Sequence, residues 1–166
     1  MNNSSTAQPV ASFGWSGFHH VALVTADLDQ TIRFYREVLG MEVSPVYPAT
    51  PPRGRHCFIK PGTTDAWGIH FFESADALIH QSDDALRRLA ANPQGPDLYR
   101  FIPGALQHVA FALPSETAGL ALRSQLQRHD VLMTGIYDQG SLRNFIFLDP
   151  NGIQLEAAWA SQTVIG

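Results

Sequence analysis

Residues 18–43, FHHVALVTADLDQTIRFYREVLGMEV, form the stretch that decides the fold. The first part, residues 18–25, is apolar and rich in β-branched side chains, which is typical of a strand. Asp27 is suited to cap a following helix. The next apolar residues recur at helical spacing, at Leu28, Ile32, Tyr35 and Leu39. Gly40 stands where a glycine usually ends a helix, and residues 41–46 resume as a strand.

The same order of elements is expected twice along the chain. After a loop rich in proline and glycine at 45–54, residues 56–60 and 67–72 are expected to form strands, which completes a β-α-β-β-β order. A helix at 75–91 and a segment with several prolines and glycines at 92–104 interrupt this rhythm. The order then returns as strand 107–113, helix 115–128 and strands 131–133, 141–148 and 153–159, with a turn at 149–152.

An internal repeat supports this duplication. The tripeptide His-Val-Ala at residues 20–22 recurs at 108–110, 88 positions later (108 − 20). His70 is separated from Glu156 by a similar 86 positions (156 − 70), so both offsets join residues that can bind a metal. We therefore predict an α+β fold of two tandem βαβββ modules. Their expected bounds are 17–73 and 105–161, with a helical linker at 74–104.

Length and composition exclude several classes of protein. A chain of 166 residues suggests one domain, expected at 17–161 after a flexible tail at 1–16. Apolar residues make up 45% of the chain, which is enough for a core. The net charge of −4 and the lack of a basic stretch argue against nucleic acid or an anionic membrane as partner. Without signal-peptide features or a long apolar run, we expect a cytoplasmic protein.

Four residues form the candidate metal site: His20, His70, His108 and Glu156. Strand side chains alternate between faces, so His20 shares a face with Ala22, and His108 shares one with Ala110. A duplicated sheet can bring equivalent positions together about its pseudo-twofold axis. Three imidazoles and one carboxylate suit a divalent transition metal (Fe, Zn, Ni, Co or Mn) rather than calcium or magnesium. Two histidines and one glutamate would also match the facial triad of non-haem iron oxygenases.

The chain resembles the vicinal-oxygen-chelate superfamily, which groups glyoxalase I, methylmalonyl-CoA epimerase, extradiol dioxygenases and the fosfomycin and bleomycin resistance proteins. Residues 18–43 resemble its opening module, and LQHVAFAL (106–113) resembles the opening strand of its second module. FIFLDPNGIQLEA (145–157) resembles its closing strand after a DP-x-G turn. The resemblance covers residues 17–159 and implies a curved, incompletely closed mixed β-sheet barrel around a metal site.

Position by position, the resemblance assigns His20, His108 and Glu156 as metal ligands, and Glu156 can also transfer a proton. His70 departs from the pattern, because glyoxalase-like members usually carry Glu or Gln there, whereas dioxygenases and fosfomycin-resistance members need no ligand at that position. The resemblance implies an enzyme that chelates vicinal oxygens of a small substrate on a divalent metal, by lyase, isomerase or dioxygenase chemistry. The alternative is a non-catalytic protein of the bleomycin-resistance type, which binds a small ligand or an antibiotic.

The resemblance also implies a homodimer with shared sites. One site would then take His20 and His70 from one chain and His108 and Glu156 from the other.

Two further residues are candidates for contact with the substrate. Arg143 is suited to pair with a carboxylate or phosphate, and Tyr137 to donate a hydrogen bond or a proton. His19 is expected to point away from His20. The remaining histidines are expected at the surface, at His56, His80 and His129. Cys57, the single cysteine, is expected to be a small buried hydrophobe.

Overall fold

The computed structural model describes residues 18–63, 67–77 and 106–161. The tail expected at 1–16 and all but the first few residues of the linker expected at 74–104 lie outside these ranges. Within them, no helix has the length and apolar character needed to span a bilayer.

The first module is a four-stranded sheet in the order β1-β4-β3-β2. Its elements are β1 (Val21–Thr25), α1 (Leu28–Arg33), the π-helical turn η1 (Phe34–Val38), β2 (Glu42–Val43), β3 (His56–Lys60) and β4 (Ile69–Glu73). β1 runs parallel to β4, and the other neighbours are antiparallel. Asp27 caps α1 by accepting a hydrogen bond from the Gln30 N–H at 2.8 Å. The helix expected from Leu28 to Leu39 is therefore present, but its second half is π-helical.

The second module repeats this topology in a sheet of order β5-β8-β7-β6. Its elements are β5 (Val109–Ala112), α3 (Glu116–Arg128), β6 (Tyr137–Asp138), β7 (Leu142–Leu148) and β8 (Gln154–Ala160). The expected strand at 131–133 is reduced to an isolated bridge between Met133 and Phe147, and the short strand β6 follows it instead. The α+β fold of two βαβββ modules is confirmed, as two mixed sheets that do not close into a barrel.

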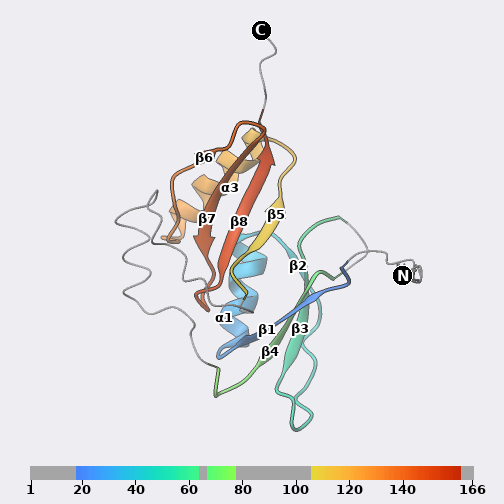
Figure 1. Ribbon diagram of the computed structural model, residues 1–166. Coiled ribbons are helices and arrows are strands. Elements are labelled where there is room, and N and C mark those ends of the chain that lie inside the picture. The colour runs from blue at the N-terminus through green and yellow to red at the C-terminus, as the bar shows by residue number, and fades with distance from the viewer. Residues whose placement is uncertain (1–17, 64–66, 78–105, 162–166) are drawn as a thin grey trace, which may run out of the picture.

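One hydrophobic core lies between the modules. Figure 1 shows α1 between the two sheets, and the buried side chains of both modules form a single cluster. Alternation along the strands turns Ile69 and Phe71 of β4 toward this core, as it does Leu155 and Ala157 of β8. Residues between them, His70 and Glu156, therefore point to the opposite face of each sheet. We call this opposite face the site face.

A buried polar contact also joins the modules. The Tyr35 hydroxyl of η1 donates to Asp149 Oδ2 at 3.2 Å, and Asp149 Oδ1 accepts the N–H of Ile153 at 2.8 Å. Burial raises the pKa of the Asp149 carboxyl, while its hydrogen bonds to Asn151 and Ile153 act in the opposite direction. The turn before β8 is thereby tied to the helical segment of the first module.

Candidate metal-binding site

The first module brings His20 and His70 together. β1 and β4 pair with Ala22 opposite His70, and His20 lies two residues before Ala22 on the same face. The ring centroids of the two histidines are 5.6 Å apart in an edge-to-face arrangement. His20 is exposed, whereas only 9% of His70 is accessible to solvent.

The second module brings His108 and Glu156 together in the same way. β5 and β8 pair with Ala110 opposite Glu156, which repeats the register of Ala22 and His70. His108 Nε2 lies 3.2 Å from Glu156 Oε2. Asn144 of β7 donates from Nδ2 to the other carboxylate oxygen at 2.6 Å, so both oxygens of Glu156 have a partner.

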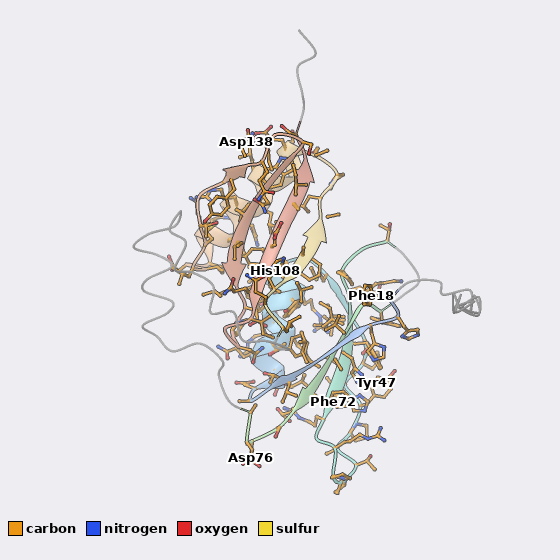
Figure 2. The ribbon with its side chains drawn as sticks, viewed as in Figure 1. Phe18, Tyr47, Phe72, Asp76, His108 and Asp138 are labelled. Carbon is orange, nitrogen blue, oxygen red and sulfur yellow. The ribbon has the colours of Figure 1, made fainter. Side chains whose placement is uncertain are left out.

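The two pairs remain separate within one chain. Among the residues that the structure describes, no three histidine, cysteine, aspartate or glutamate side chains are placed to hold a metal together. Figure 2 shows His108 at the start of β5, apart from Phe18, Tyr47 and Phe72 of the first module. Each module therefore supplies two of the four candidate ligands. In the described sheets, the strands that begin next to His20 and His108, β1 and β5, both lie at an edge.

The surroundings of His70 keep its ring neutral. Phe58 stacks on it with centroids 3.9 Å apart, and Phe72 lies at 4.0 Å. Burial, followed by the charges of His56, His20 and Arg53, lowers the pKa of His70 from 6.5 to about 4. A neutral imidazole has a lone pair on one ring nitrogen, which is the form that binds a metal.

His56 is not a surface residue. It was expected at the surface, but it is half-buried and its Nδ1 lies 2.9 Å from Nε2 of His70. Its ring stacks on Tyr47 on one side and on Phe72 on the other. The only signal in the sequence was the matching His-x-Phe pattern of β3 and β4, which has no meaning until the pairing of the two strands is known.

The other histidines differ in how far the structure describes them. His129 is exposed at the end of α3, as expected, and His80 lies outside the described residues. The expectation that His19 points away from His20 is wrong, because the Nδ1 atoms of the two rings lie 2.8 Å apart. Both residues precede β1, so the alternation of a strand does not separate their side chains.

Arg143 is directed away from the candidate site. It pairs with Trp159 in the β7–β8 register, whereas Ile146 pairs with Glu156, so Arg143 and Glu156 lie on opposite faces. On its own face Arg143 forms ion pairs with Glu116 of α3 and, at 3.7 Å, with Asp138. These contacts anchor α3 and leave the substrate role of Arg143 without geometric support.

Tyr137 in β6 is half-buried and pairs in register with Asn144, whose side chain contacts Glu156. A role of Tyr137 in substrate binding stays a prediction.

The residues present fit a divalent transition metal. Imidazole nitrogens and one carboxylate are the donor set of zinc and of non-haem iron, nickel, cobalt and manganese sites. The carboxylate of Glu156 is oriented by an amide, as metal-binding carboxylates usually are. In addition, Oδ1 of Asn144 is buried and has no hydrogen-bond partner among the described residues, so an unused hydrogen-bond acceptor lies on this face.

Comparisons with known proteins agree with this fold. Residues 17–157 match the family model of the Glyoxalase/Bleomycin resistance protein/Dioxygenase superfamily. No match was found among curated proteins. A glyoxylase/bleomycin resistance protein/dioxygenase domain from a Frankia species is similar in structure, with a TM-score of 0.66 and 21% identity over 90% of this chain and 95% of that chain.

Two other solved structures show the functional range of similar folds. Lactoylglutathione lyase from Agrobacterium tumefaciens matches with a TM-score of 0.57 and 20% identity, over 88% of this chain and 95% of that chain. An antibiotic binding protein from a Streptomyces species matches with a TM-score of 0.60 and 17% identity, over 90% of this chain and 100% of that chain. At these identities the similarity shows the fold alone.

Proposed function

Because the chain belongs to the glyoxalase/bleomycin resistance protein/dioxygenase superfamily, we propose that it is a metal-dependent enzyme that acts on a small substrate with two neighbouring oxygens. Superfamily members usually use a divalent metal. The proposed ligands are His20, His70, His108 and Glu156. The observation that carries the proposal is the repeated register: Ala22 pairs with His70 as Ala110 pairs with Glu156, so each module offers one matched half of a ligand set.

The separation of these halves supports a shared site in a homodimer. β1 and β5 each have an edge open to a further strand in the described sheets, and an open strand edge is a template for pairing with another chain. Pairing of β1 in one subunit with β5 of the partner subunit would bring His20 beside the partner's His108. The twofold symmetry of such a dimer would create two equivalent sites.

The chemistry assigned to the chain's own residues follows from their contacts. When bound, a divalent metal supplies Lewis-acid stabilisation of negative charge on the two substrate oxygens. Glu156 is positioned to accept or return a substrate proton, because Asn144 and His108 fix the direction of its carboxylate. His70, with its lowered pKa, stays unprotonated at neutral pH. Lyase, isomerase and extradiol-type dioxygenase reactions are all compatible with this arrangement.

A non-catalytic binding protein is the second candidate. The first module exposes apolar side chains, with Phe18 96% and Tyr47 43% accessible to solvent. Such a surface suits the capture of an apolar ligand, and one protein of similar fold is an antibiotic binding protein.

The proposal is tested by metal content, measured by elemental mass spectrometry after reconstitution. His20→Ala and Glu156→Ala should each lose the metal, whereas His129→Ala, which changes an exposed histidine outside the site, should keep it. A purified heterodimer of the first two variants has one intact shared site, so it should hold about one metal ion per dimer where the wild type holds about two. A heterodimer without metal would rule out sharing, and wild-type protein without metal would leave the binding protein as the better account.

A further inference from the structure

A hairpin before β3 holds polar side chains next to the candidate ligands of the first module. Tyr47 and His56 exchange two backbone hydrogen bonds, with N to O distances of 2.8 and 3.2 Å. Thr50 and Arg53 exchange two more, of 3.0 and 2.8 Å. The backbone of the hairpin, residues 47–56, is therefore fixed at its base and at its tip before a ligand binds.

The hairpin lines a small cavity of about 240 Å³, which we call the hairpin pocket; it is formed by Pro48, Thr50, Pro51, Pro52, Arg53 and His56. Three of these side chains carry hydrogen-bond donors suited to an anion, namely a guanidinium, an imidazole and a hydroxyl. Carboxylates within the described ranges pair with Arg55, Lys60 and Arg143 but not with Arg53. The positive charge of Arg53 is thus available to a ligand.

His56 is held in an orientation that suits a donor. Its ring stacks on Tyr47, with centroids 5.0 Å apart and planes at 20°, and on Phe72, at 5.3 Å and 26°. Its Nδ1 contacts Nε2 of His70. When Nδ1 accepts the hydrogen of His70 Nε2, the neutral His56 ring carries its own hydrogen on Nε2 and donates there. The same arrangement leaves the Nδ1 lone pair of His70 for a metal.

Aromatic side chains connect the hairpin pocket with the candidate ligands. Phe58 lies beside both His70, at 3.9 Å, and His20, at 6.2 Å between centroids. Tyr47 is at 6.1 Å from Phe58 on the other side. This row of rings offers an apolar surface that begins at the pocket and ends at His20, with Phe58 nearly perpendicular to Tyr47 and His20. A planar ring can pack on such a surface face to face or edge to face.

We propose that the hairpin pocket binds a carboxylate of the substrate through Arg53 and His56, while a planar ring of the substrate lies on the aromatic side chains that lead to His20. A carboxylate matches the guanidinium fork in shape and carries the opposite charge. The ring would present its two oxygens at the candidate metal, so this inference rests on the proposed function. The substrate class is then an aromatic carboxylate with neighbouring oxygen substituents.

The test uses full-length protein with ¹³C-labelled histidine, reconstituted with Zn²⁺ and titrated with benzoate, benzamide or inorganic phosphate. Benzoate should shift the His56 ring signals saturably, and benzamide, which lacks the charge, should bind at least about tenfold more weakly. Arg53→Gln should weaken benzoate binding about tenfold, the size expected for one charge-assisted hydrogen bond. Arg36→Gln removes the same charge from η1, whose Arg36 acts on Cys57 and not on the hairpin pocket, and should bind benzoate as the wild type does.

Three outcomes would overturn the inference. These are equal binding of benzoate and benzamide, equal effects of Arg53→Gln and Arg36→Gln, and phosphate binding as tight as that of benzoate. The metal content of Arg53→Gln, measured on the same samples, should equal that of the wild type. A protein that binds benzoate through Arg53 but takes up no metal would refute the proposed function and would still support carboxylate binding in the hairpin pocket.

Discussion

Replacement of Asn144 by leucine should separate the orientation of Glu156 from the stability of the sheet. Asn144 donates one hydrogen bond of 2.6 Å to Glu156, and its own Oδ1 is buried without a hydrogen-bond partner in the described part of the chain. Leucine has the same branching pattern as asparagine, so it can occupy the same position on the strand. The substitution therefore removes one favourable contact and one unfavourable burial at the same position.

The two effects on stability are of similar size. A hydrogen bond to a charged group contributes about 1.5–3 kcal/mol, and an unpaired buried polar atom costs about 1–3 kcal/mol. We expect the free energy of unfolding of Asn144→Leu to change by less than about 1 kcal/mol. Metal affinity should fall by about 10–100-fold, because the carboxylate of Glu156 loses the group that orients it.

Metal affinity is measured by competition with a chelator, and stability by urea unfolding of the metal-free protein. Gln154→Leu is the matched control, because Gln154 is a buried amide on the same face, and its Oε1 also lacks a hydrogen-bond partner among the described residues. This control should keep the wild-type metal affinity. Equal losses of affinity in the two variants, or no loss in Asn144→Leu, would refute the view that Asn144 orients Glu156.

Four further substitutions probe the core, the contact between modules and the site. In Gly119→Ala the added Cβ would lie 2.7 Å from the Trp159 ring, so overpacking of about 1–3 kcal/mol should exceed the helix-propensity gain of about 1 kcal/mol, and urea unfolding should show a net loss of stability. Asp149→Ala leaves buried donors unpaired and should lower the free energy of unfolding by about 3 kcal/mol, against about 1 kcal/mol for Tyr35→Phe; equal losses would contradict the described network. In metal-free protein, the unfolded chain protonates His70 near pH 6.5 but the folded chain only near pH 4, so stability should fall as the pH drops through this window. His70→Phe should flatten that pH dependence, and a ring titration by NMR with a midpoint near 6.5 would contradict it.

The order of elements and the neighbours that share a face with each candidate ligand could be predicted from the sequence because both depend on local periodicity. Alternation along a strand places His20 beside Ala22 and His108 beside Ala110, and the repeat shows that the modules are equivalent. The observed registers of Ala22 with His70 and of Ala110 with Glu156 agree with that equivalence. The metal ligation itself stays a prediction.

Contacts between strands could not be predicted, because periodicity does not say which strand lies beside which. The sequence alone predicts a surface position for His56, and only the pairing of β3 with β4 brings it to His70. Arg143 reads as free to meet a substrate until the β7–β8 register places it on the face opposite Glu156. The π-helical turn at 34–38 has no signal in the apolar spacing, which fits an α-helix equally well.

The division of the candidate ligands between the two modules has a thermodynamic consequence for a shared site. Metal binding and subunit association then become a single linked equilibrium, because each bound ion holds two chains together and each dissociating dimer opens two sites. Dilution of the protein would therefore release metal, and a chelator would dissociate the dimer. The fraction of sites that hold a metal ion would then depend on the concentration of the protein.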